Sequence, residues 1–127
     1  MKRISKKALF TAIALIGVAS SCGGSSGSTS TTAVVADVLV TAESGIRLDQ
    51  SAYTATSGEI SIAYINQDTI RHTLIVEKDG TKVSGFELDV SRKGDVDQGT
   101  VALQPGTYQL LCTVPGHQNM RASFTVS

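Results

Sequence analysis

The sequence predicts an all-β fold, a Greek-key β-sandwich of about eight short strands. Residues 33–127 are rich in Val, Ile, Thr and Tyr, which favour strands. Turn-forming residues recur at short intervals through this region, and its apolar residues show no sustained helical period. Many short strands separated by regular turn signals are typical of two sheets packed face to face.

The expected strands follow one another with glycine, proline or aspartate in the gaps between them. Their ranges are 34–41, 46–54, 59–66, 72–77, 82–90, 97–103, 107–113 and 121–126. The gaps contain, in order, Gly45, Gly58, Asp68, Asp79 with Gly80, Gly94 with Asp95, Pro105 with Gly106, and Gly116. Each of these residue types favours a turn because of its backbone freedom, its fixed φ or its side-chain hydrogen bonds.

Period-two alternation orients the side chains of two expected strands, because every second residue of a strand lies on the same face. The alternating sets are Ile60, Ile62 and Tyr64, and Tyr108, Leu110 and Cys112. Cys112 is therefore expected to point toward the core. Residues 103–108 also resemble a tyrosine corner, in which a phenol bonds a nearby backbone group, so Tyr108 is expected to be structural.

The N-terminal residues 1–21 have the pattern of a secretory signal peptide. Lys2, Arg3, Lys6 and Lys7 precede an apolar run over residues 8–19. A membrane-spanning helix needs about 20 apolar residues, and this run is too short for that role. We therefore expect the protein to act outside the cytoplasm, in the periplasm or at the cell surface.

Small residues lead into Cys22, and this sequence resembles the lipobox of bacterial lipoproteins, in which the cysteine is cleaved at and lipidated. Two acyl chains would suffice to anchor the protein stably to a membrane. Ordinary cleavage nearby, leaving an unmodified thiol, is the alternative. Residues 22–33 are rich in Gly, Ser and Thr and are expected to form a tether. Residues 34–127 then form one domain.

Charge and motif content exclude several functions. The chain has 11 basic and 11 acidic side chains, and loss of the signal peptide leaves an acidic excess of about four charges with no block of like charge. This balance argues against a nucleic-acid partner. The sequence also contains no phosphate-binding glycine loop and no nucleophile elbow.

The stretch with most chemical content is residues 112–120, Cys-Thr-Val-Pro-Gly-His-Gln-Asn-Met. It places Cys112, His117 and Met120 near the end of an expected strand, and the other histidine, His72, lies at the start of an earlier one. Two His, one Cys and a weak axial Met are the ligand set of blue copper sites. Cys112 is the only cysteine of the expected domain, and metal ligation explains a thiol in an oxidising compartment. A buried, inert cysteine is the alternative.

Residues 34–127 closely resemble the cupredoxins, the small blue copper proteins. The resemblance lies in residues 66–72, Asn-Gln-Asp-Thr-Ile-Arg-His, and in the loop at residues 112–120. The spacing from Cys112 to His117 is similar to azurin, and that from His117 to Met120 to amicyanin. Many members have asparagine directly after the first histidine to brace the cysteine loop, and here a hydroxyl, that of Thr73, takes its place.

The resemblance implies a cupredoxin-like fold and one type 1 copper ion, with His72, Cys112 and His117 as equatorial ligands and Met120 as the axial ligand. It implies a monomeric one-electron carrier without substrate turnover, whose redox partner is a protein such as a cytochrome or a membrane oxidase. Asp68 or Thr73 is expected to orient His72, and Pro115 and Gly116 to shape the loop. Val114 and Pro115 are expected to form an apolar collar around a partly exposed His117.

Three other functions use the same residues. The first is capture and delivery of copper to a membrane oxidase outside the cytoplasm, which requires exchange of the metal itself. The second is zinc binding by His72, Cys112 and His117, since geometry and availability decide which metal is bound. The third is a metal-free structural or adhesive sandwich.

Overall fold

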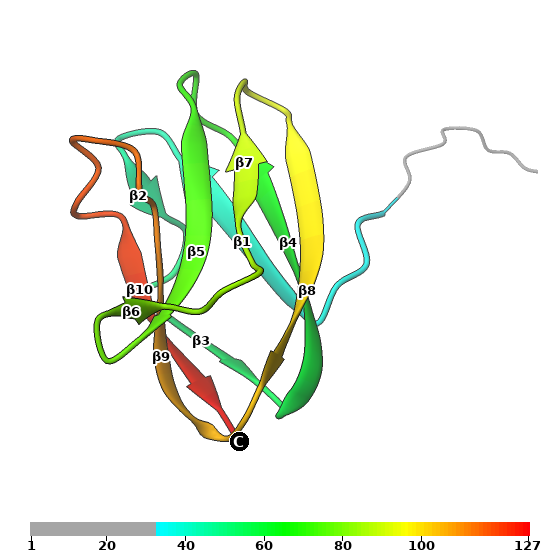
Figure 1. Ribbon diagram of the computed structural model, residues 1–127. Coiled ribbons are helices and arrows are strands. Elements are labelled where there is room, and N and C mark those ends of the chain that lie inside the picture. Colours follow the sequence, from blue (N-terminus) through cyan, green and yellow to red (C-terminus); the bar gives the residue numbers. More distant parts are fainter. Residues whose placement is uncertain (1–32) are drawn as a thin grey trace, which may run out of the picture. The chain divides into compact units, whose positions relative to one another are not determined.

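The computed structural model describes residues 33–127, so the expected signal peptide, Cys22 and most of the tether lie outside the described residues. Val34–Ser127 forms a compact unit of strands (Figure 1). The strands are β1 (Val38–Glu43), β2 (Arg47–Leu48), β3 (Ala52–Ala55), β4 (Gly58–Asn66), β5 (His72–Lys78), β6 (Thr81–Lys82), β7 (Leu88–Val90), β8 (Val96–Leu103), β9 (Gly106–Leu111) and β10 (Arg121–Val126). Within residues 33–127 no helix has the length and apolarity needed to cross a membrane.

The strands form two sheets, and the predicted all-β sandwich is confirmed. One sheet has the order β2-β1-β4-β8, and the other has the order β3-β10-β9-β5-β6, with β7 pairing β5. Both sheets are mixed, because β1 runs parallel to β4 and β3 runs parallel to β10. The remaining strand pairs are antiparallel.

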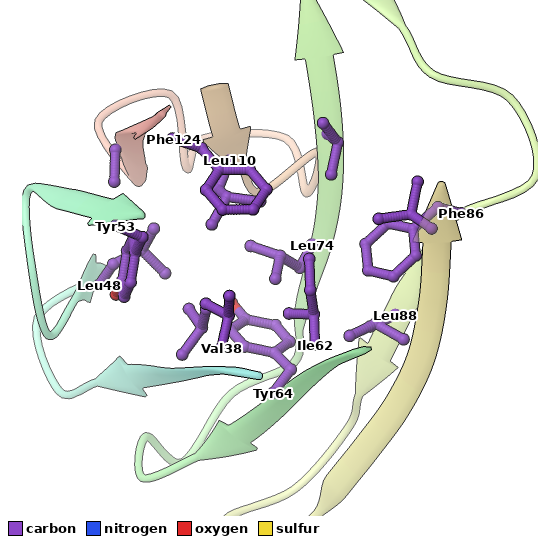
Figure 2. Close-up of a cluster of buried hydrophobic side chains, with 14 of the residues drawn as sticks. Val38, Leu48, Tyr53, Ile62, Tyr64, Leu74, Phe86, Leu88, Leu110 and Phe124 are labelled. Atoms are coloured by element: carbon purple, nitrogen blue, oxygen red, sulfur yellow. The ribbon is translucent and has the colours of Figure 1, made fainter. Parts of the chain in front are cut away.

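The core fills the space between the sheets, where side chains from both meet (Figure 2). The expected alternation holds in β4, where Ile60, Ile62 and Tyr64 are buried and face this core. Burial of one large apolar side chain stabilises a fold by about 1.5–3 kcal/mol, so these positions fix the register of β4. The predicted tyrosine corner is also confirmed, since the Tyr108 hydroxyl donates to the Gln104 carbonyl oxygen at 2.8 Å.

The expected strand at 46–54 is instead two strands that belong to different sheets. The chain leaves the first sheet after β2 and enters the second at β3. Asp49 holds this crossing: its N–H donates to the Thr41 carbonyl oxygen at 2.9 Å, and its Oδ1 accepts the Thr41 N–H at 2.8 Å. The Tyr53 hydroxyl donates to the same carboxylate at 2.6 Å. These bonds link residues that lie before and after the crossing. The prediction of a single strand at 46–54 is therefore wrong.

The expected strand at 82–90 is likewise interrupted. β6 ends at Lys82, and Gly85 has a φ of 84°, a left-handed conformation that glycine adopts without strain. The chain bends there and inserts Phe86, which is 3% exposed, into the core before β7 begins.

Candidate metal centre

Three of the predicted ligands lie at one end of the sandwich, the upper end in Figure 1. His72 is the first residue of β5, Cys112 directly follows β9, and His117 lies in the loop before β10. β5 and β9 are antiparallel neighbours, with Ile75 opposite Leu111. The start of β5 therefore lies beside the end of β9, and the topology brings together residues that are far apart in the chain.

The potential ligand atoms of His72, Cys112 and His117 all lie within 4.8 Å of one another. Cys112 Sγ is 3.5 Å from His117 Nδ1, and the two imidazole ring centroids are 4.9 Å apart. All three side chains are buried, with exposures of 0%, 4% and 6% in chain order. The cluster is therefore compact and shielded from water.

The hydrogen bonding of the two imidazoles fits a metal. His72 Nδ1 is buried and has no hydrogen-bond partner in the described part of the chain, although its Nε2 lies 3.1 Å from Asp68 Oδ2. An unpaired buried polar atom is costly, and a metal ion would satisfy it. Burial, and then the nearby His72, lower the pKa of His117 below its usual value. This shift favours the neutral imidazole, the form that binds metals.

Backbone hydrogen bonds close the loop that carries three of the four predicted ligands. The Cys112 N–H donates to the Met120 carbonyl oxygen at 3.0 Å, and the Met120 N–H donates to the His117 carbonyl oxygen at 2.9 Å. The His117 N–H donates to the Val114 carbonyl oxygen at 3.0 Å, and Gly116 has a φ of 88°. Met120 is fully buried in the core cluster beside this loop. Its role as axial ligand stays a prediction.

Thr73 contacts the cysteine side of the cluster. Its N–H points at Cys112 Sγ at 3.4 Å, and its Oγ1 accepts the Thr113 N–H at 2.8 Å. The hydroxyls of Thr73 and Thr113 are also 2.7 Å apart. The expectation that the Thr73 hydroxyl braces the cysteine loop in place of an asparagine is confirmed. Of the two residues expected to orient His72, Asp68 contacts that ring and Thr73 braces the cysteine loop instead.

Asp68 is held firmly beside His72. Its Oδ1 accepts the Thr69 N–H at 2.7 Å, and its Oδ2 lies 3.1 Å from His72 Nε2. Burial acts to raise the pKa of Asp68, but the Thr69 N–H and the contact with His72 lower it below the usual value. The carboxylate is therefore ionised at neutral pH.

Asn66 organises the loops under the cluster and was given no role from the sequence. Its side-chain N–H groups donate to the carbonyl oxygens of Ile70 at 2.8 Å and Val90 at 3.3 Å. Its Oδ1 accepts the Asp68 N–H at 2.8 Å, which forms an Asx turn. Asparagine two residues before aspartate at a strand end was the signal that could have identified this turn.

The expected partial exposure of His117 is wrong, because its residue exposure is 6%. In the same loop Val114 is half-buried against the core and Pro115 is exposed. The apolar collar of Val114 and Pro115 stays a prediction.

Comparison with known proteins identifies the fold. Neither a protein-family model nor a curated protein sequence matches the chain. Among solved structures, reduced auracyanin from Roseiflexus castenholzii is similar with a TM-score of 0.64 and 19% identity, covering 75% of this chain and 99% of that one. Auracyanin A, a "blue" copper protein from Chloroflexus aurantiacus, has a TM-score of 0.59 and 19% identity over 70% of this chain and 96% of that one.

A purple cupredoxin from Nitrosopumilus maritimus is similar at a TM-score of 0.58 and 18% identity, over 72% of this chain and all of that one (100%). At these identities the likeness concerns the fold. The chain therefore has the cupredoxin fold, and the cluster of His72, Cys112 and His117 at its end is suited to a type 1 copper ion.

Proposed function

We propose that this protein is a mononuclear type 1 copper protein that carries single electrons outside the cytoplasm. The observation that supports it best is the buried cluster of His72, Cys112 and His117, in which His72 Nδ1 has no hydrogen-bond partner among the described residues 33–127. The cluster lies at one end of a fold shared with proteins described as blue copper proteins. Met120, which follows in the same closed loop, is proposed as the axial ligand.

The four side chains of the proposed site suit a metal ion that alternates between two oxidation states one electron apart. A bound copper ion supplies the Cu(I)/Cu(II) couple. The Cys112 thiolate and the two neutral imidazoles serve both oxidation states, and the Met120 thioether is a soft ligand that favours Cu(I). These side chains are fixed by the bonds of Asp68 to His72 and of Thr73 to the cysteine loop. A rigid site changes little when it gains or loses an electron, so exchange is fast.

Electrons are proposed to leave through the loop that contains His117. Val114 is half-buried there and Pro115 is exposed, which gives a small apolar contact surface close to the cluster. Small, weak interfaces suit transient electron-transfer partners. The proposed partner is a cytochrome or a membrane oxidase, and the protein is proposed to act as a monomer.

The proposed location is the outer side of a membrane, to which the tether at residues 22–33 would link the domain. The signal pattern at residues 1–21 and the small residues before Cys22 support lipidation of that cysteine. Mass spectrometry of the mature N-terminus tests this part of the proposal, because an unmodified terminus lacks the mass of the acyl chains.

Titration of the purified protein with Cu(II), followed by visible and EPR spectroscopy, tests the copper site. We expect an intense blue absorption at one equivalent of copper, and its loss in Cys112→Ser. Cys22→Ser is the matched control, because it replaces the other of the chain's two cysteines, which lies outside the proposed site, and is expected to keep the band. A colourless or pale product from the unmodified protein contradicts the proposal and favours zinc, Cu(I) delivery or a structural sandwich.

A further inference from the structure

Asp68 has a nearly buried carboxylate, and each of its two oxygens faces a polar group. Oδ2 lies 3.1 Å from His72 Nε2, and Oδ1 accepts the Thr69 N–H at 2.7 Å. The backbone of the same residue is also held, because the Asp68 N–H donates to Asn66 Oδ1 at 2.8 Å. The carboxylate therefore has little freedom to rotate.

The state of the His72 ring follows from this contact. An ionised carboxylate only accepts hydrogen bonds, and a neutral imidazole carries one proton. Because Nε2 faces the Asp68 carboxylate, a neutral ring that donates to Asp68 carries its proton on Nε2 and keeps a lone pair on Nδ1. Nδ1 is buried and has no hydrogen-bond partner among residues 33–127. That lone pair is the electron pair that a metal would require.

We propose that Asp68 is a positioning residue that fixes His72 in the Nε2–H tautomer and lowers the reduction potential of the site. The inference rests on the proposed copper function. A fixed tautomer means that metal binding needs no rearrangement of this ring. The carboxylate also places one negative charge a single side chain away from the metal, and a negative charge stabilises Cu(II) more than Cu(I).

NMR of the metal-free protein tests the positioning role without copper. Long-range ¹H–¹⁵N correlations of labelled histidine are expected to show His72 as the Nε2–H tautomer. Asp68→Asn keeps an oxygen that can accept this proton and is expected to keep the tautomer. Asp68→Ala removes the acceptor and is expected to give a mixture of tautomers. An Nδ1–H ring in the unmodified protein, or an unchanged tautomer in Asp68→Ala, overturns the positioning role.

The reduction potential of the copper-loaded protein tests the charge. Asp68→Asn is expected to raise the affinity for Cu(I) relative to Cu(II) about tenfold, which corresponds to about 59 mV for a one-electron couple. Asp95→Asn is the matched control, because its carboxylate accepts the N–H groups of Ser91 and Arg92 in a neighbouring loop. A shift in Asp68→Asn no larger than in Asp95→Asn overturns the role in setting the potential.

The two proposals fail in different ways. If the unmodified protein gives no band that depends on Cys112, the copper function is wrong, and the tautomer of the metal-free protein still tests the contact of Asp68 with His72. If the band forms and neither Asp68 variant differs from the control, the copper function stands and the role of Asp68 is wrong.

Discussion

At the scale of single residues, Thr73 joins the two halves of the candidate site. It follows His72 on β5, and its side chain bonds the residue after Cys112. The Thr73 hydroxyl lies 2.7 Å from the Thr113 hydroxyl and also accepts the Thr113 N–H. It therefore uses most of its hydrogen-bonding capacity. One oxygen atom of Thr73 therefore adds a side-chain link to the pairing of β5 and β9 that places Cys112 beside His72.

Thr73→Val is expected to lower the free energy of unfolding of the metal-free protein by about 0.5–1.5 kcal/mol, the net contribution of a typical hydrogen bond, here that of the partly buried Thr113 N–H. Valine has nearly the same shape as threonine, so the change isolates the hydroxyl. Urea unfolding measures it. Thr73→Ser keeps the hydroxyl and is expected to lose less, and equal losses in the two variants would show that packing of the methyl group matters instead.

The sequence was sufficient to predict the ligand cluster and to name Asp68 and Thr73 beside it, but not which contact each of these two makes or the role of Asn66. His72, Cys112 and His117 lie at or near the ends of the expected strands, and the cupredoxin resemblance implied that these strand ends meet. The contacts of Thr73 and Asn66 depend on the register between β5 and β9 and on the loop before β8. No periodicity in the sequence encodes such distant pairings.

At the scale of elements, β8 is an edge strand whose inner face is covered by the segment around β7. A Cβ at Gly99 would lie 3.3 Å from Leu88 Cδ2 and 3.5 Å from Phe86 Cε1. Glycine in a strand often marks such a close approach. The same segment is where the expected strand at 82–90 is interrupted, because Phe86 turns into the core. Alternation alone predicted β4 and β9 well but could not show where a chain bends inward.

Gly99→Val is expected to destabilise the protein by about 1–3 kcal/mol, because the added carbons overpack the space beside Phe86 and Leu88. Thermal unfolding followed by circular dichroism measures it. Ala102→Val is the control, since Ala102 is an exposed residue of the same strand and valine favours strands. Similar destabilisation of both variants would argue against the close approach at Gly99.

At the scale of the whole molecule, the two sheets together bury the side chains of Tyr53 and Tyr64, and this burial makes their hydroxyls harder to ionise. Burial, followed by the contact with Asp49, raises the pKa of Tyr53, and burial raises the pKa of Tyr64. The Tyr64 hydroxyl also has no hydrogen-bond partner among residues 33–127. The crossing at Asp49, which places Tyr53 in the second sheet, could not be predicted from the period of residues 46–54.

The stability of the fold is expected to fall as the pH rises above about 10, the ordinary pKa of tyrosine. A pKa that is raised by folding contributes stability below the unfolded value and loses it as the pH rises. Urea unfolding at several alkaline pH values measures the slope. The double variant Tyr53→Phe, Tyr64→Phe is expected to show a shallower decline, and an unchanged slope would contradict this origin.

The order of the donors along the chain also determines when the protein can acquire its metal. Synthesis runs from the N-terminus, so His72 leaves the ribosome well before Cys112, His117 and Met120. β3 stays unpaired until β10, its parallel neighbour, has been made. A chain that ends near residue 110 contains all four strands of the first sheet but no thiolate for the site. The full proposed donor set would therefore exist only after residue 120 has been synthesised, close to the end of the chain.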